Sequence, residues 1–184
     1  LVVTDGSLLD YETKEIWTFN VSATDGEQSF TMEVTVNLTD VNEAPVIEDV
    51  EKVYSVDENT ATGIAFGSFT VFDPDAGDKL TYTLTGALTG AAGISGTLNK
   101  TLADIFYVDE SANSSGKRTA SIRVKNKGLL DYEELYKASS KNASYPVTIT
   151  ITDKDSKSVD VTTKITVQDV NEDLTATGGT FYIQ

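Results

Sequence analysis

Acidic residues recur in matching strings along this chain of 184 residues, and they are the side chains best suited to chemistry. The string Asp-Val-Asn-Glu at 40–43 returns at 169–172, and Leu-Leu-Asp-Tyr-Glu at 8–12 returns at 129–133. The chain has no histidine and no cysteine, which excludes disulfides and thiolate zinc sites and removes the usual general base. Calcium needs neither residue, because it binds six to eight oxygens from carboxylates, amides and backbone carbonyls. The recurring acids therefore predict Ca²⁺ binding.

The overall charge excludes other classes of function. The net charge is −15, from 29 acidic and 14 basic residues, which argues against nucleic acid as a partner because phosphate binding needs clusters of Lys and Arg. No apolar run approaches the roughly 20 residues of a membrane-spanning helix, so we expect no direct membrane insertion within this chain. The acid pair Asp131 and Glu133 repeats the pair Asp10 and Glu12, and repeated pairs suit structure better than glycosidase catalysis. We expect no enzyme.

No single loop holds enough ligands for a calcium ion. Asp73-Pro74-Asp75 provides two acids, but the glutamate that an EF-hand loop needs at its twelfth position is absent. A calcium site must therefore gather ligands from loops far apart in the sequence. A β-sandwich does this, because its loops meet at the two ends of the fold.

Alternating apolar residues predict the strands that position these loops. Trp17, Phe19, Val21 and Ala23 take every second position, and the same period returns at 145–151. We expect one buried face on each strand and place Trp17 in the core. The segments 25–29 and 153–158 each separate two such runs and predict hairpin loops.

Seven predicted strands lie near 46–56, 64–72, 80–84, 105–108, 118–124, 146–152 and 159–167. This pattern predicts an all-β fold, a seven-stranded Greek-key β-sandwich in tandem repeats. Residues 1–43 are predicted to be the C-terminal part of one repeat, 44–172 a complete repeat and 173–184 the first strand of a following one. The Gly- and Ala-rich segment 86–96 predicts a flexible loop. Because the chain opens in mid-pattern, we expect an excerpt of a longer protein.

Five short motifs in a fixed order resemble the cadherin repeat over the whole chain. They are Asp57-Glu58-Asn59, Asp73-Pro74-Asp75, the two Leu-Asp-Tyr-Glu strings, the Asp25 and Asp153 positions, and the two Asp-Val-Asn-Glu linkers. The resemblance implies cadherin-like sandwiches with calcium bound at the junction between neighbouring repeats. The chain departs from the family pattern at Glu43 and Glu172, where the family more often has Asp. The Asn that the family often has shortly after the position of Asp75 is also missing, and Asp78 is the nearest residue to that place.

The resemblance implies two sets of ligands. The first junction would use Asp10, Glu12, Asp40, the carbonyl of Val41, Asn42, Glu43, the carbonyl of Ala44, Asp73, Asp75 and Asp153. The second would use Glu58, Asp131, Glu133, Asp169, Asn171, Glu172 and Asp173. Asp25 matches a ligand of a junction that precedes Leu1.

The resemblance implies a mechanical role, in which Ca²⁺ stiffens the junctions of a secreted or cell-surface protein for adhesion or display. The composition and the linker look more like those of a bacterial surface adhesin than of an animal receptor. Other copies of the same surface protein, or polysaccharide, are the expected partners. The alternative is a carbohydrate-binding module of an extracellular polysaccharide-degrading or biofilm protein, with Tyr136 as its first candidate contact.

Overall fold

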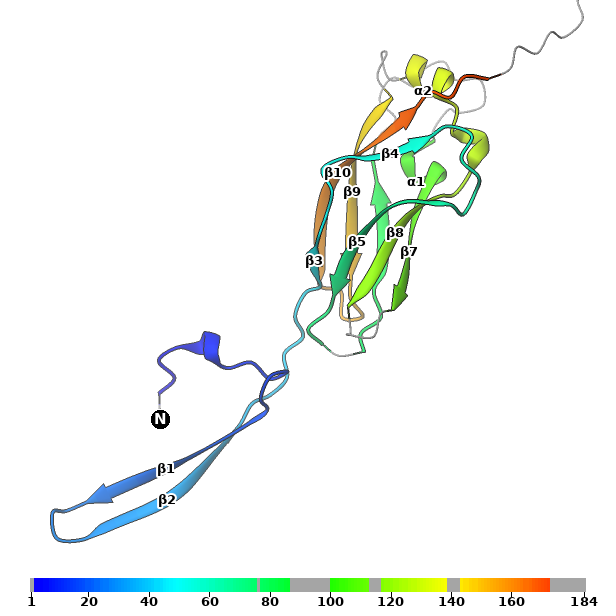
Figure 1. Cartoon of the computed structure of the whole chain (residues 1–184). Coiled ribbons are helices and arrows are strands. Elements are labelled where there is room, and N and C mark those ends of the chain that lie inside the picture. Colours follow the sequence, from blue (N-terminus) through cyan, green and yellow to red (C-terminus); the bar gives the residue numbers. More distant parts are fainter. Residues whose placement is uncertain (1, 76, 87–99, 113–116, 139–142, 173–184) are drawn as a thin grey trace, which may run out of the picture.

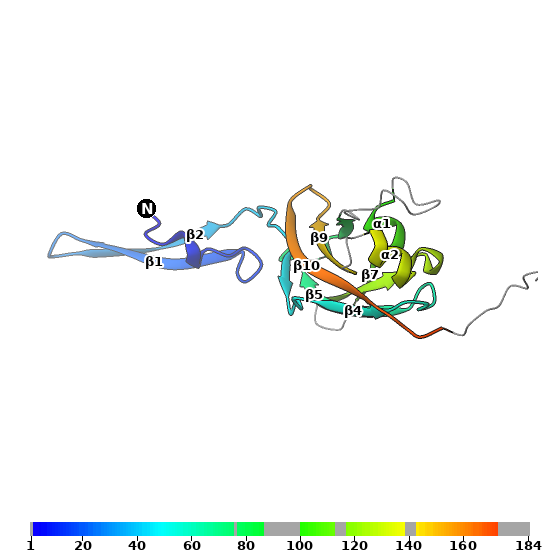
Figure 2. The ribbon, with the colours of Figure 1, turned by 90° about the horizontal axis from the view of Figure 1, so that it is seen from above.

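The computed structural model describes residues 2–75, 77–86, 100–112, 117–138 and 143–172. They form a two-stranded hairpin and a two-sheet β-sandwich, which are joined by the linker at 38–45 (Figure 1). Seen from above, the hairpin extends away from one end of the sandwich (Figure 2). None of the described helices has the length and apolar character that a membrane crossing requires.

The hairpin consists of β1 (Ile16–Thr24) and β2 (Ser29–Asn37), preceded by the short 3-10 helix η1 (Gly6–Leu8). The strands pair antiparallel with Trp17 opposite Val36 and Val21 opposite Met32. The pairing places all the alternating apolar residues on one face and leaves mainly Thr, Ser and Asn on the other. The predicted hairpin loop between these strands is confirmed, and Gly26 in it has a φ of 97°, which glycine adopts readily.

The sandwich contains two four-stranded sheets. One has the order β3-β5-β8-β7, with β3 at Val46–Glu48, β5 at Ala65–Phe72, β8 at Arg118–Val124 and β7 at Phe106–Ala112. The other has the order β4-β10-β9-β6, with β4 at Tyr54–Asp57, β10 at Ser158–Gln168, β9 at Ser144–Thr152 and β6 at Thr81–Thr85. The prediction of an all-β sandwich is confirmed.

The first predicted strand, at 46–56, is in fact two strands in different sheets. β3 pairs antiparallel with β5, whereas β4 pairs parallel with β10. Between them Asp49 has a φ of 58°, a left-handed conformation that ends an extended strand. The chain therefore crosses from one sheet to the other within a segment that alternation alone could not divide.

The core lies between the two sheets. The side chains of Tyr145, Val147, Ile149 and Ile151 on β9 are at most 1% exposed, which confirms the predicted alternation in the second copy of the pattern. Two helices absent from the prediction, α1 (Leu102–Ile105) and α2 (Tyr132–Ala138), add further buried side chains, among them Leu135. A second 3-10 helix, η2, spans Lys127–Leu129.

The hairpin contains no comparable core, and the prediction that Trp17 lies in a core is wrong. Trp17 is only half-buried, and Phe19 and Val21 are 37% and 44% exposed. The physical reason is that β1 and β2 have no opposing sheet against them among the described residues. The Lys14 ammonium instead lies 4.2 Å from the centre of the Trp17 ring, a cation–π contact.

Two predictions fall largely or wholly on parts of the chain that the structure does not describe. Apart from Gly86, the predicted flexible loop at 86–96 lies outside the described residues. The predicted first strand of a following repeat, at 173–184, lies outside them as well.

Candidate metal centre

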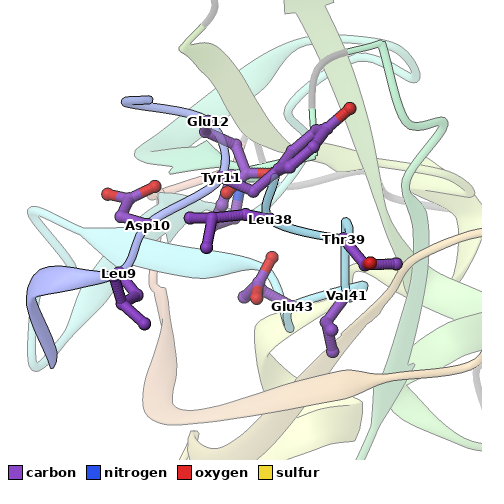
Figure 3. A pocket seen from close by; sticks show the side chains of 9 residues that line it. Leu9, Asp10, Tyr11, Glu12, Leu38, Thr39, Val41 and Glu43 are labelled. Carbon is purple, nitrogen blue, oxygen red and sulfur yellow. The ribbon is translucent and has the colours of Figure 1, made fainter. Parts of the chain in front are cut away.

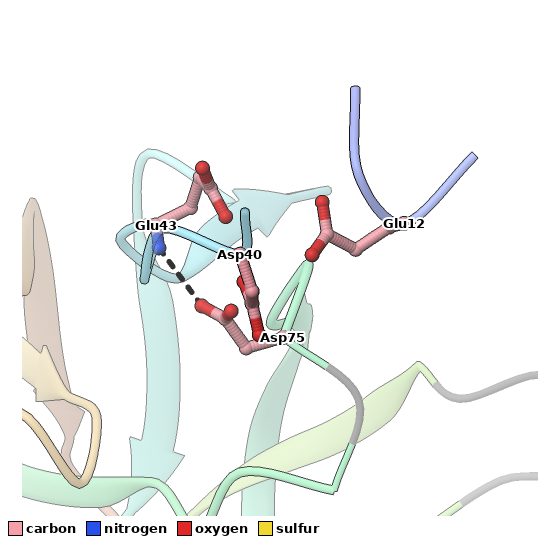
Figure 4. A group of neighbouring side chains, drawn as sticks. All are labelled: Glu12, Asp40, Glu43 and Asp75. Atoms are coloured by element: carbon pink, nitrogen blue, oxygen red, sulfur yellow. Dashed lines mark hydrogen bonds between the residues drawn. The ribbon is translucent and has the colours of Figure 1, made fainter. Parts of the chain in front are cut away.

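Four carboxylates from three separate segments converge where the hairpin meets the sandwich. Glu12 precedes β1, Asp40 and Glu43 belong to the linker, and Asp75 follows β5. One carboxylate oxygen from each lies within 4.8 Å of the other three (Figure 4). Asp75 is 7% exposed, whereas Glu12 and Asp40 are exposed. This group, called the inner cluster below, unites four of the sequence-predicted ligands.

Backbone hydrogen bonds fix the Asp75 member of the inner cluster. The Glu43 N–H donates to Asp75 Oδ2 at 2.8 Å, which connects the linker to the loop after β5. The Asp75 N–H donates to Asp73 Oδ1 at 3.1 Å, because the Asp-Pro-Asp sequence forms a turn in which the first carboxylate accepts a hydrogen bond two residues on. The Glu43 backbone is therefore one point at which the linker is attached to the sandwich.

A second acidic group lies beside the first. One carboxylate oxygen from each of Asp73, Asp78 and Asp153 lies within 4.8 Å of the other two, and we call this group the outer cluster. Asn42 links the two clusters, because its Nδ2 donates to Asp153 Oδ2 at 2.8 Å and to the Glu43 carbonyl at 3.1 Å.

Asp153 is held by the loop between β9 and β10. Its Oδ1 accepts hydrogen bonds from the N–H groups of Asp155 at 2.8 Å and Lys157 at 2.9 Å. Burial acts to raise the pKa of Asp153, but the hydrogen bonds from Asn42, Lys157 and Asp155 outweigh it, so the pKa lies below its usual value. The Lys157 ammonium also donates to the Asn42 carbonyl, a further contact between this loop and the linker.

The electrostatics of the site disfavour so many bare carboxylates. Desolvation, followed by the charges of Glu12 and Asp75, raises the pKa of Glu43. Desolvation also raises the pKa of Asp73, despite the hydrogen bond from Asp75. Four buried oxygens at the site accept no hydrogen bond from the residues that the structure describes: Asn42 Oδ1, Glu43 Oε2, Asp73 Oδ2 and Asp78 Oδ2.

The donor set fits a hard divalent cation. All the converging side-chain ligands are oxygens, and the unpartnered ones are those that a bound cation would satisfy. The residues present therefore match calcium, whose coordination needs six to eight oxygens and tolerates irregular geometry.

Asp10 is the one predicted carboxylate of the first junction that belongs to neither cluster. The Asp10 carboxylate accepts hydrogen bonds from the N–H of Thr13 at 3.1 Å and from its hydroxyl at 2.8 Å. Asp10 and Val41 line a cavity of about 400 Å³ together with Glu12 and Glu43 (Figure 3). The carbonyl ligands predicted at Val41 and Ala44 stay predictions.

A third acidic group lies at the far end of the sandwich. One carboxylate oxygen from each of Glu58, Glu133 and Glu172 lies within 4.8 Å of the other two. Glu58 is 2% exposed, and it accepts hydrogen bonds from the N–H groups of Tyr132 at 2.6 Å and Val170 at 2.8 Å. Asn59 Nδ2 donates to Glu172 Oε1 at 2.9 Å.

The other predicted ligands at this end lie outside that group. Asp131 accepts a hydrogen bond from the Glu134 N–H at 2.9 Å, at the start of α2. Asp169 and Asn171 are exposed, and Asp173 lies outside the described residues.

A backbone hydrogen bond acts to lower the pKa of Glu133, but desolvation and the charges of Glu58, Glu172 and Asp169 outweigh it and raise the pKa. Asp25 accepts hydrogen bonds from Glu27 and Gln28 in the hairpin loop, far along the hairpin from these groups.

Sequence reasoning left Asp78 out of the ligand set, although it belongs to the outer cluster. Its only signal was its place, three residues after Asp75, near the position where the family has Asn. Burial of Asp78, at 4% exposed, depends on tertiary packing and could not be derived from that spacing.

Comparisons with known proteins show which fold this is. No protein-family model matches the chain. A stretch of 79 residues, 41% of the chain, is 33% identical to the mouse (Mus musculus) protein named cadherin EGF LAG seven-pass G-type receptor 1, of which the match spans 3%.

Solved structures resemble a larger share of the chain. Protocadherin Gamma B2 extracellular cadherin domains 3-6 superpose with a TM-score of 0.54 and 22% identity, over 89% of this chain and 33% of that one. Human protocadherin-24 EC1-2 superposes with a TM-score of 0.56 and 21% identity, over 89% of this chain and 70% of that one. The resemblance predicted from the sequence motifs is confirmed at the level of the fold.

Proposed function

Since this chain has the fold of cadherin repeats, we propose that it is a calcium-dependent junction between two such repeats of an extracellular adhesion protein. Residues 1–43 are then the C-terminal part of one repeat, 44–172 a complete repeat, and 173–184 the start of another. Calcium bound by the inner and outer clusters joins the hairpin, the linker and the sandwich. The third acidic group, at the far end, is half of the next junction.

The observation that supports this proposal is that carboxylates from three separate segments converge on one point. They are Glu12 before β1, Asp40 and Glu43 in the linker, and Asp75 after β5. Carboxylates at such distances repel one another strongly, so a bare site favours separation of the segments that hold them. A divalent cation bound between the carboxylates attracts all of them and so replaces their mutual repulsion by a net attraction between the segments. The same ligands would then hold the hairpin and the sandwich in one arrangement.

The mechanism is mechanical rather than catalytic. The hydrogen bonds of Asn42 and Glu43 orient the linker, and bound Ca²⁺ supplies the attraction between the carboxylates on either side of it. Adhesion, an extracellular location and contacts with other copies of the same protein follow from the cadherin-like fold as parts of this proposal. The bacterial origin and the carbohydrate-binding alternative stay predictions. Tyr136, the candidate sugar contact, is half-buried and stacks on Tyr132 with ring centres 5.4 Å apart.

Calcium titration of the whole chain tests the proposal. We expect isothermal titration calorimetry to detect ions bound at the junction, and Asp75→Asn to weaken this binding by about tenfold or more, because a buried anionic ligand becomes neutral. The matched control is Glu33→Gln, which removes one charge from the polar face of the hairpin. If Asp75→Asn binds as many ions as tightly as the wild type, the ligand assignment is wrong.

A further inference from the structure

The buried carboxylate of Asp78 has a cation of the protein beside it. The Lys154 ammonium lies 2.5 Å from Asp78 Oδ1 and 3.5 Å from the Asp155 carboxylate. The side chain of Asp78 is 4% exposed, whereas that of Lys154 is 56% exposed. The backbone of Asp78 is held too, because the Arg118 guanidinium donates to its carbonyl oxygen. Asp78 is therefore a fixed partner, and Lys154 is the mobile one of the pair.

Lys154 provides a partner for only one of the carboxylate oxygens of the outer cluster. It contacts Oδ1 of Asp78, while Oδ2 of Asp78 and Oδ2 of Asp73 are buried and accept no hydrogen bond within the described part of the chain. A buried carboxylate oxygen without a partner is costly unless a cation lies next to it. The outer cluster has three carboxylates and one ammonium beside them, so its net charge is −2. This charge can be neutralised by a divalent cation.

The two cations cannot share Asp78 freely. An ammonium at hydrogen-bonding distance from Asp78 lies within a few ångströms of any ion that the outer cluster holds, and like charges at such distances repel. The lysine side chain is long and flexible, and more than half of it is in solvent. It can therefore swing away without disturbing the core, whereas the Asp78 side chain is 4% exposed and its backbone carbonyl is held by Arg118.

We propose that Lys154 is a built-in competitor of Ca²⁺ at the outer cluster of Asp73, Asp78 and Asp153. This inference rests on the proposed calcium junction and adds its regulation. Without calcium the ammonium neutralises Asp78. Calcium fills the inner cluster first, and it fills the outer cluster in a second, weaker step that displaces Lys154. The junction consequently stiffens in two stages as the calcium concentration rises.

The test is calorimetric calcium titration of the whole chain, with native mass spectrometry to count the ions. We expect Lys154→Gln to tighten the weaker step by about tenfold and to leave the tighter step unchanged. The matched control is Lys52→Gln, an exposed lysine in the segment between β3 and β4, which is expected to titrate like the wild type. Because Lys154→Gln leaves Asp78 buried without its partner, thermal unfolding in EDTA checks that the variant is folded.

A double variant, Asp78→Ala with Lys154→Gln, removes the Asp78 carboxylate and its ammonium partner together. We expect it to fold and to lose the weaker step, and retention of that step would overturn the inference. Identical titrations of the wild type and Lys154→Gln, with ions bound in both, would overturn the inference and leave the proposed function standing. Calcium binding by Lys154→Gln with none by the wild type would contradict both the proposed function and the expected filling of the inner cluster before the outer one. If neither the wild type nor Lys154→Gln binds calcium, the inference and the proposed function are both overturned.

Discussion

Glu43 shows how a single residue connects the linker to the sandwich. Its N–H binds Asp75, while its carboxylate lies within 4.8 Å of Asp75, Asp40 and Glu12 oxygens. The same residue thus makes one attractive contact through its backbone and repulsive ones through its side chain. Desolvation and those neighbouring charges raise its pKa, so ionised Glu43 is disfavoured in the folded junction relative to the unfolded chain.

This shift predicts opposite responses to acid with and without calcium. Because the folded pKa of Glu43 is raised, its stabilising contribution is present below the unfolded pKa and is lost as the pH rises through the folded pKa. Without calcium, mild acidification therefore favours the closed junction. With calcium bound, the pKa of Glu43 falls, because the ion favours the charged form.

The measurement is a pH titration of the Glu43 side-chain carboxyl by carbon NMR, in EDTA and in calcium. The variant Glu43→Gln assigns the resonance. A Glu43 carboxyl that titrates below the usual glutamate range in EDTA would contradict the electrostatic description of the junction.

At the scale of elements, two hairpins with the same pattern have different surroundings. β9 and β10 lie in a four-stranded sheet that packs on a second sheet, and Ile149 is fully buried there. β1 and β2 form a sheet of two strands, and Val21, at the position that matches Ile149 in the sequence repeat, is 44% exposed. An isolated two-stranded hairpin is only marginally stable in water.

We therefore expect unequal effects from equivalent truncations. Ile149→Ala should lower the free energy of unfolding by about 2–5 kcal/mol, because it leaves a cavity in a packed core. Val21→Ala should cost less than about 1 kcal/mol, since its side chain is partly in solvent already. Urea denaturation followed by circular dichroism measures both. Equal costs would mean that the apolar face of the hairpin is covered in solution.

At the scale of the whole molecule, the hairpin and the sandwich are joined through the linker and its acidic neighbours (Figures 1 and 2). Among the described residues, hydrogen bonds across this region come from Asn42, from Glu43 and from the Lys157 ammonium. Nothing in this set resists bending strongly, because polar contacts in partly exposed positions contribute little net free energy.

We expect small-angle X-ray scattering to show a broader or more bent ensemble in EDTA than in millimolar calcium. Added ions would replace repulsion at the junction by attraction and so restrict the linker. Potassium chloride at the same ionic strength is the control, because screening alone weakens the repulsion without joining the segments. Superimposable profiles in EDTA and calcium would rule out calcium stiffening.

The sequence by itself determined the period of the strands, the positions of both hairpin loops and the identity of most acids that now lie together. These features are local: alternation follows from strand geometry, and Asp, Gly and Pro form turns through their own backbone preferences. Five short motifs in a fixed order, among them the recurring Asp-Val-Asn-Glu and Leu-Asp-Tyr-Glu, resembled the cadherin repeat, and the comparisons confirm that fold.

Only the tertiary structure decided where the chain changes sheet, that Trp17 lacks a core, and that Asp78 is buried beside Lys154. Each of these depends on pairings between residues far apart in the sequence. Lys154 and Asp78 are 76 positions apart, and their contact exists only because β6 and β9 lie next to each other in one sheet. Local patterns set which elements form, whereas the free energy of packing those elements together decides which side chains meet and which are left exposed.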